Sequence, residues 1–385
     1  MKHAVTTFSW HPHCEITLLV DAEHYLPPML EAIEQATHYI LLEMYLVKPG
    51  KLFNKVSMAL QQAAIRGVRC YLLFDDFGSK EISERKIRNL QHPNIQLQRY
   101  NPLSSHNPLV SLYRVLWRKL PQDLYRTHRK LLLVDGQLAF TGGTGICDEF
   151  SETRFGPWHE TMVRFKGRVV EDWQTLFCAS WPEPLTLMRS NCDSDSSTRC
   201  QLAAAYAQHL NPLQQSILQM CKNAKQRLWL STAYFVPTWR LHHQLIKAAK
   251  RGVDVRLLLP GSHIDHPSIR HASRRLYARF LRHGIKIYEY QPRFLHAKAL
   301  LCDDMVSLGS CNFDRWGMRW NMEANLQIDS AAFAHQVCTM LEEDFSHSIR
   351  YDYHRWCQRS WRLRLQEAFW GWMDRMLAKY SNRLR

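Results

Sequence analysis

Short apolar runs alternate with amphipathic helical patterns along most of the chain. In the first half, a helical pattern over residues 26–36 leads into an apolar run over 39–47, which Glu43 interrupts. Residues 63–76 then combine a helix end, Gly67 and a second apolar run. A glycine directly after the last helical residue is a common helix stop, because glycine adopts the left-handed conformation without steric cost. The pattern therefore predicts helices alternating with buried strands.

The same order of elements recurs in the second half. A helical pattern over 212–224 precedes the apolar run 227–236, and residues 248–261 repeat the helix–glycine–strand junction with the shared letters A-A-x-R-G-V. The strand-like segments 92–100 and 283–290 form a further matching pair. Self-similarity of this kind indicates an internal duplication.

Strands that alternate with helices predict an α/β fold, and we expect its sheets to be largely parallel. The two copies should be related by a pseudo-twofold axis, with the functional site where they meet. The junction between them is expected near residues 189–199, which are polar and rich in Ser and Asp.

The pattern HxKxxxxD occurs twice, once in each half. Its fixed positions are His128, Lys130 and Asp135 in the first copy and His296, Lys298 and Asp303 in the second. Residues two apart in a strand point to the same face, so each histidine and its lysine should aim at one spot. A histidine beside a fixed cation suits phosphoryl chemistry. Turns of small residues follow at 141–145 and 309–312.

This doubled motif, followed by GSCNFD at 309–314 and NMEAN at 321–325, resembles the phospholipase D superfamily. The resemblance covers roughly residues 15 to 350 and is strongest to the bacterial cardiolipin synthase branch, of the type without N-terminal transmembrane helices. It implies two tandem α/β/α sandwich domains, 1–190 and 200–350, whose motifs meet in one pocket. Residues 351–385 are expected to form a basic, aromatic helical segment.

The resemblance also implies roles for the motif residues. One imidazole attacks phosphorus to give a phosphohistidine, while the other protonates the leaving alkoxide. By the family's pattern, His128 is the nucleophile and His296 the acid. Lys130 and Lys298 would hold the non-bridging phosphate oxygens. The motif aspartates, Asp135 and Asp303, are expected to brace the catalytic motif rather than touch substrate.

Each histidine needs an acid to fix its tautomer, and the family places one about thirty residues further along. Glu160 is therefore expected to orient His128, with Glu149 and Glu152 as alternatives, and Glu323 to orient His296.

The small-residue turns supply candidate phosphate ligands. Ser310 and Asn312 are expected to donate hydrogen bonds to phosphate oxygens, although turn formation alone would also explain them. The synthases usually carry Asn where this chain has Gly145, so Thr144 or backbone N–H groups would replace the missing amide. No cluster of acidic residues with hard-metal spacing accompanies the motifs, and we expect neither a metal nor another cofactor.

Charge narrows the partner to a polyanion. With 50 Lys and Arg against 35 Asp and Glu, the net charge of +15 suits nucleic acid or an anionic lipid surface. The segment 110–120 mixes leucines, Trp117 and arginines as an interfacial helix does, and Leu116, Trp117 and Arg118 are predicted to contact the membrane. A lid helix packed on the core would show the same pattern. The stretch from Tyr351 likewise suits a membrane interface or an amphipathic helix that closes the fold.

Three functions are compatible with these features. We favour a phosphatidyltransferase that makes cardiolipin from phosphatidylglycerol, with phosphatidylglycerol or phosphatidylethanolamine as donor, and that does not bind nucleic acid. A nuclease or phosphodiesterase of the same superfamily, and a silent lipid-binding scaffold, are the alternatives. The intact motifs disfavour the scaffold, and the aromatic-basic segments disfavour the nuclease.

Cysteine usage and hydropathy indicate the compartment. The 11 cysteines lack CxxC pairs, as expected in a reducing cytoplasm. The chain has neither a signal-peptide pattern nor an apolar run of membrane-spanning length. We therefore expect a peripheral protein on the cytoplasmic face of the bacterial inner membrane.

Overall fold

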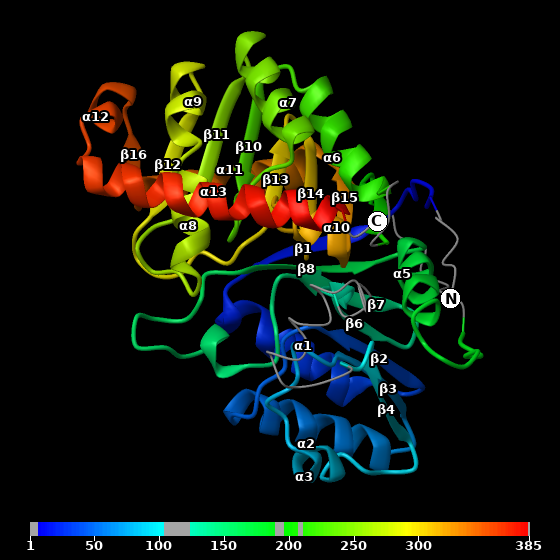
Figure 1. Ribbon diagram of the computed structural model, residues 1–385. Coiled ribbons are helices and arrows are strands. Elements are labelled where there is room, and N and C mark those ends of the chain that lie inside the picture. The colour runs from blue at the N-terminus through cyan, green and yellow to red at the C-terminus, as the bar shows by residue number, and fades with distance from the viewer. Residues whose placement is uncertain (1–6, 104–123, 189–195, 207–210, 384–385) are drawn as a thin grey trace.

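The computed structural model describes residues 7–103, 124–188, 196–206 and 211–383, and it contains two β-sheets with helices packed against them (Figure 1). The strands of the first sheet are β1 (Glu15–Val20), β2 (Tyr39–Met44), β3 (Arg69–Asp75), β4 (Ile95–Tyr100), β6 (Lys130–Val134), β7 (Leu138–Gly142) and β8 (Thr161–Lys166). Its helices are α1 (Ala22–Gln35), α2 (Lys51–Ile65), α3 (Glu84–Arg88) and α5 (Val169–Cys178).

The second half repeats this plan. Its strands are β9 (Arg199–Ala205), β10 (Arg227–Ser231), β11 (Asp254–Pro260), β12 (Lys286–Tyr290), β13 (Ala299–Cys302), β14 (Met305–Gly309), β15 (Asn321–Asp329) and β16 (Ser348–Tyr351). Its helices are α6 (Pro212–Asn223), α7 (Trp239–Lys250), α8 (Pro267–Arg274), α9 (Tyr277–Arg282), α10 (Gly317–Trp320) and α11 (Ala331–Ser346).

The strand orders of the two sheets confirm the duplication. The first sheet runs β4-β3-β2-β6-β7-β8-β1, and the second contains β12-β11-β10-β13-β14-β15-β9 in the corresponding places. The second sheet adds β16 beside β12, and β5 (Arg126–Thr127), which comes from the first half of the chain, beside β15. This α/β architecture in two matching units is the predicted fold class.

The prediction of largely parallel sheets is wrong. Only β2-β3-β4 and β10-β11-β12 are parallel series, and the other main pairings are antiparallel. The reason is local, because β6 connects to β7 across residues 135–137 and β13 to β14 across 303–304. Connections this short can join only antiparallel neighbours, whereas parallel ones require a crossover of a dozen or more residues.

The predicted helix–glycine–strand junctions are confirmed. Gly67 and Gly252 follow α2 and α7 with φ of 96° and 89°, the left-handed conformation that ends a helix, and β3 and β11 begin two residues later. The interrupted apolar run is β2, which is buried throughout, including Glu43.

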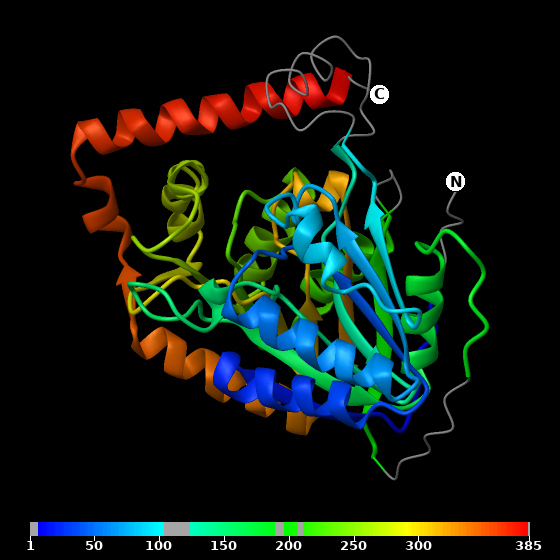
Figure 2. The same ribbon diagram turned by 90° about the horizontal axis from the view of Figure 1, so that it is seen from below.

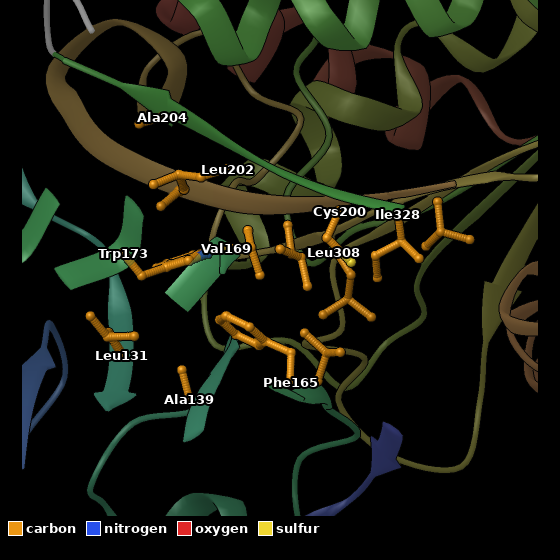
Figure 3. Packing of buried hydrophobic residues seen from close by; sticks show 14 of the residues in the cluster. Leu131, Ala139, Phe165, Val169, Trp173, Cys200, Leu202, Ala204, Leu308 and Ile328 are labelled. Carbon is orange, nitrogen blue, oxygen red and sulfur yellow. The ribbon is translucent and has the colours of Figure 1, made fainter. Parts of the chain in front are cut away.

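Three apolar clusters hold the layers together. One lies between the first sheet and α1 and α2, and another between the second sheet and α6 and α7. The third joins the two halves, since it includes Leu131 and Phe165 of the first sheet, Leu308 and Ile328 of the second, and Trp173 of α5 (Figure 3). Burial of each such side chain contributes about 1.5–3 kcal/mol, so the two halves share one core rather than merely touching.

Two further helices follow β16. These are α12 (Tyr353–Cys357) and α13 (Trp361–Arg383), and Figure 2 shows α13 as a long helix along one side of the molecule. In the described part of the chain, no helix is both long and apolar enough to cross a bilayer.

The motif aspartates brace the turns that follow β6 and β13, as expected. Asp135 adopts φ of 53° and accepts hydrogen bonds from the backbone N–H groups of Thr37, His38 and Tyr39, each at 2.8 Å. Asp303 adopts φ of 52° and accepts from the N–H groups of residues 225–227, each at 2.9 Å. Both carboxylates thus tie a hairpin turn to the start of a neighbouring strand.

We predict that Asp135→Ala lowers the free energy of unfolding by about 2–4 kcal/mol, because four charge-assisted hydrogen bonds are lost, three from backbone N–H groups and one from the Thr37 hydroxyl. Asp135→Asn should lose less, since asparagine tolerates the positive φ and its oxygen can still accept from two N–H groups. Urea unfolding measures both variants. Equal losses in the two variants would show that the bonds to the second carboxylate oxygen carry the whole effect.

Candidate active site

Both motif histidines line one cavity of about 760 Å³ between the two halves. His128 and Lys130 reach it from the first half, and His296 and Asn312 from the second. A cavity of this volume is in the range that accommodates small-molecule ligands or a lipid headgroup. The sequence-based expectation that the two motifs meet in one pocket is therefore confirmed.

Backbone pairing between the halves brings the histidines there. The strand β5 precedes His128 and pairs with the start of β15, and the His128 N–H donates to the Met322 carbonyl at 2.9 Å. In the mirrored position, the His296 N–H donates to the His159 carbonyl at 2.8 Å. The segment before each motif thus lies beside the segment that leads into a glutamate of the other half.

The histidine–glutamate pairs are consequently crossed. His128 Nδ1 lies 2.9 Å from Glu323 Oε1, and His296 Nδ1 lies 2.5 Å from Glu160 Oε2. All four side chains are buried. Glu160 and Glu323 are the two partners that the sequence indicated, but the prediction that each orients the histidine of its own half is wrong.

Strand geometry explains the correction. Within each half, the histidine precedes the strand at one edge of a three-strand series, β6-β7-β8 or β13-β14-β15, and the glutamate lies at the start of the third strand. Neighbouring strands are about 4.8 Å apart, so residues two strands apart are separated by about 10 Å. In the part of the chain that the structure describes, the carboxylate directly beside each imidazole comes from the other half.

The alternatives to Glu160 lie elsewhere. Glu149 forms an ion pair with Lys48 at 2.5 Å on the cavity wall. Glu152 pairs with the exposed Lys51 at 2.9 Å. Neither carboxylate forms an ion pair or a hydrogen bond with a motif histidine.

Two of the three predicted phosphate ligands are occupied elsewhere. The Ser310 hydroxyl donates to Glu323 Oε2 at 2.5 Å and accepts from the Ala324 N–H at 3.0 Å. Thr144 donates to the Tyr25 hydroxyl at 3.0 Å. Neither side chain lines the cavity, so both predictions are corrected: Ser310 supports Glu323, and Thr144 joins the first turn to α1. Asn312 does line the cavity, and its buried Oδ1 has no hydrogen-bond partner.

The two turns differ at one position that faces the glutamates. Gly143 occupies the place that Ser310 holds in the second half, because each directly follows the corresponding strand, β7 or β14. A Cβ on Gly143 would collide with the carboxylate of Glu160. Glu160 therefore approaches the turn closely, and it accepts a hydrogen bond from the Thr161 N–H at 2.8 Å. Because Gly143 has no side chain, Glu160 receives no hydroxyl donor at the place where Ser310 donates to Glu323.

Burial dominates the electrostatics of the site. It lowers the pKa of His128 despite the opposing charge of Glu323, and it lowers that of His296 further, with Lys298 acting in the same direction. It raises the pKa of Glu160 to about 7, against the nearby Lys298 charge, and lowers that of Lys130 to about 7. Both imidazoles are therefore neutral at rest, as a nucleophile requires.

Each motif lysine lies close to the histidine of its own motif. Lys130 Nζ donates to the His128 carbonyl at 2.7 Å, and Lys298 Nζ lies 3.5 Å from Glu160 Oε2. Both side chains are almost fully buried. They place positive charge next to the cavity, where a phosphodiester would bring negative charge.

Sequence reasoning missed a buried ionic cluster next to this site. His159 lies between Asp21, at 2.9 Å, and Asp344, at 3.0 Å, and Arg293 also pairs with Asp21. The cluster joins the two halves immediately before Glu160. Only the position of His159 beside Glu160 in the sequence could have pointed to it, because Asp21 and Asp344 are far away along the chain.

The predicted membrane-contact residues Leu116, Trp117 and Arg118 lie outside the described residues. The expectation for them stays a prediction.

Fold and site together define a class: a duplicated α/β protein in which each half contributes a motif histidine to a shared cavity. Solved structures share this fold. Phosphatidylserine synthase from Haemophilus influenzae aligns with a TM-score of 0.70 at 12% identity, over 98% of this chain and 95% of that one. Polyphosphate kinase from Porphyromonas gingivalis aligns with a TM-score of 0.59 at 14% identity, over 88% and 49%.

Sequence comparison identifies the family. The model described as "Cardiolipin synthase, PLD-like domain" matches residues 29–149 and 217–346, one match in each half. Cardiolipin synthase A from Pseudomonas aeruginosa is 31% identical over 348 residues, 87% of this chain and 68% of that protein. Cardiolipin synthase from Geobacillus kaustophilus is 29% identical over 367 residues, 92% and 70%. The chain belongs to the cardiolipin synthase branch of the phospholipase D superfamily.

The crossed pairs predict which residues are energetically coupled. In a double-mutant cycle of His128→Gln and Glu323→Gln, we expect a coupling of about 1–3 kcal/mol in the free energy of unfolding. The matched cycle of His128→Gln and Glu160→Gln should give less than about 0.5 kcal/mol. Urea unfolding of the single and double variants measures both. A larger coupling in the second cycle than in the first would instead support pairing of each histidine with the glutamate of its own half.

The His159 cluster predicts a pH dependence of stability. Burial alone would lower the pKa of His159, but Asp344 and Asp21 outweigh it and raise the pKa to about 10. Because an unfolded histidine titrates near 6.5, the stabilisation is complete below about pH 6.5 and is lost as the pH rises toward 10.

We expect His159→Gln to lower the free energy of unfolding at pH 6.5 by about 3–5 kcal/mol, because Asp344 loses its cation and Asp21 keeps only Arg293. The difference between the variant and the parent should shrink between pH 6.5 and 10 in urea unfolding. A difference that does not change with pH would mean that His159 is uncharged in the folded protein.

Proposed function

We propose that this protein is a phosphatidyltransferase that makes cardiolipin through a phosphohistidine intermediate. One observation carries the proposal: two buried imidazoles, each with its own glutamate and lysine, face a single cavity. One phosphorus can then be attacked by one ring while the other ring protonates the leaving group. The family to which the chain belongs supports the choice of lipid over other phosphodiesters.

In the first step, Nε2 of His128 attacks the phosphorus of a phospholipid, and the bond from phosphorus to the headgroup oxygen breaks. The proton that the Glu160–His296 pair holds passes through His296 to the departing alkoxide. In the second step, His296 takes the proton from a hydroxyl of phosphatidylglycerol, whose oxygen displaces His128 from phosphorus. The products are cardiolipin and the headgroup alcohol, and both histidines return to their starting state.

The glutamates fix the tautomers that these steps need. Glu323 accepts from Nδ1–H of His128, so the lone pair of Nε2 is available to the cavity. The Ser310 hydroxyl donates to Glu323 and helps to hold this carboxylate beside His128, where positive charge develops on the ring during attack. Glu160 has a pKa of about 7, so the Glu160–His296 pair can hold and release a proton near neutrality. This asymmetry supports His128 as nucleophile and His296 as acid.

Lys130, Lys298 and Asn312 are proposed to stabilise the phosphate oxygens in the transition state. One such donor typically contributes about 3–4 kcal/mol. The roles of nucleophile, acid and phosphate ligand are thus all assigned to side chains of this protein.

Aromatic rings around the histidines favour transfer over hydrolysis. Tyr45 packs against His128 at 4.7 Å between ring centroids, and Trp158 and Phe150 pack against His296 at 5.1 and 5.3 Å. Apolar walls of this kind limit the water that can reach the intermediate. The lipid substrates place the protein at a membrane, and we propose a peripheral position on the inner face of the bacterial inner membrane.

Incubation with phosphatidylglycerol vesicles, with and without phosphatidylethanolamine, tests the function by lipid analysis. Cardiolipin is the expected product. Phosphatidic acid as the sole product would indicate a hydrolase, and unchanged lipid with cleaved plasmid DNA would indicate a nuclease.

The roles of the histidines are tested by intact-protein mass spectrometry of the same reaction. His128→Ala should reduce transfer by about 10⁴-fold or more and show no phosphatidyl adduct. His296→Ala should retain the adduct and release it slowly. The exposed His335→Ala serves as the control and should match the parent protein. An adduct found on His296 instead would reverse the assignment.

A further inference from the structure

The long helix α13 is held in a fixed orientation on the second half. Its Glu367 is 1% exposed and pairs with Arg274 of α8 at 3.4 Å and with Arg359 at 2.6 Å. At Gly371 the helix passes so close to Arg275 that a Cβ there would force the Arg275 side chain to move. Breaking a buried ion pair is strongly unfavourable, so the helix cannot rotate freely about its axis.

The face of α13 opposite Glu367 is an apolar stripe. Its members are Trp361, Leu365, Phe369, Trp372 and Met376, which are 65%, 59%, 52%, 49% and 48% exposed. Their spacing of four, four, three and four residues places them within an arc of about 80° on the helix. The other exposed large apolar side chains of the described residues are scattered, with two on α2, Leu363 on another face of α13, and the rest on separate segments.

Positive charge accompanies the apolar stripe. Arg362 and Arg364 are exposed on α13, Arg355 is exposed on α12, and the guanidinium of Arg362 lies over the Trp361 ring at 5.7 Å. The one acidic side chain described on α13 is Glu367, which is buried in its ion pairs. Aromatic and aliphatic side chains on one face, with arginines beside them, match the anionic headgroups and upper acyl region of a membrane surface.

The same helix also reaches the catalytic cavity. Trp370 and Met373 line it, as do Ser268, Ile269 and Ala272 of α8, on which α13 packs. Figures 1 and 2 show α13 extending along one side of the second half. A surface that receives the apolar stripe would therefore lie next to the wall of the cavity.

We propose that the outer face of α13 docks on an anionic phospholipid surface and holds the mouth of the cavity at the level of the lipid headgroups. This inference rests on the proposed function only for what the docking achieves. The docking itself is inferred from the surface of α13. Substrate would then enter from the membrane without crossing water.

Co-sedimentation with vesicles tests the docking. The parent protein should bind phosphatidylglycerol–phosphatidylcholine vesicles, and added salt should weaken the binding because it screens the arginines. Phe369→Glu/Trp372→Glu should reduce partitioning by about tenfold or more, since two large apolar side chains no longer insert. The control Met58→Glu/Ile65→Glu changes two side chains on α2 that are each 65% exposed, and it should bind as the parent does.

Circular dichroism and the thermal midpoint establish that the α13 variant is folded, and light scattering gives its mass in solution. Unchanged vesicle binding by the folded variant would overturn the proposal. A parent dimer that becomes a monomer in this variant, with vesicle binding retained, would assign the stripe to a second copy of the chain and would also overturn it.

Turnover separates this inference from the function. The ratio of transfer on vesicles to transfer on dispersed short-chain phosphatidylglycerol should fall about tenfold in the α13 variant and stay constant in the α2 control. If the parent binds vesicles through α13 but forms no lipid product, the proposed function is wrong and the docking is supported. If the α13 variant transfers lipid on vesicles as well as the parent does, the docking is wrong and the function is supported.

Discussion

The crossed contact between each histidine and a glutamate of the other half is the constraint on which this structure depends. Among the described residues, the carboxylates that pair with His128 and His296 both come from the other half. Neither half can therefore hold a correctly oriented imidazole alone. The shared apolar cluster, the pairing of β5 with β15 and the His159 cluster all keep the halves in the one arrangement that completes both pairs.

Burying this much charge is costly, and the site reduces the cost by pairing. Glu160, Glu323, Lys130 and Lys298 are each less than 2% exposed. Each carboxylate meets an imidazole and a nearby ammonium group, so charges of opposite sign alternate across the interface. The same low polarity strengthens the interaction of the lysines with any phosphate that enters.

The duplication has not produced two identical halves of a site. Ser310 gives Glu323 a hydroxyl donor, while Gly143 leaves Glu160 with none at the equivalent place. The two carboxylates therefore have different hydrogen-bond donors around them. A reaction that needs one ring as nucleophile and the other as acid benefits from this difference. The C-terminal helix adds a second asymmetry, because α13 adjoins the cavity from one half only.

Much of this could be predicted from the sequence, because local patterns carry it. Apolar periodicity and the two glycine junctions located α1, β2, α2 and β3 and their counterparts, since helix stops and buried strands depend on neighbouring residues. The repeated motif identified His128 and His296. The bracing role of Asp135 and Asp303 also followed from the motif.

Only the tertiary structure decided how these elements combine. Short hairpins made most strand pairs antiparallel, and the interface between the halves exchanged the partners of Glu160 and Glu323. It also turned Ser310 toward a glutamate instead of toward the cavity. These outcomes depend on which residues lie side by side across strands and across the two halves. Spacing along the sequence does not give distances in space. A glutamate about thirty residues from its histidine can lie two strands away from it, while a glutamate of the other half lies in contact with it.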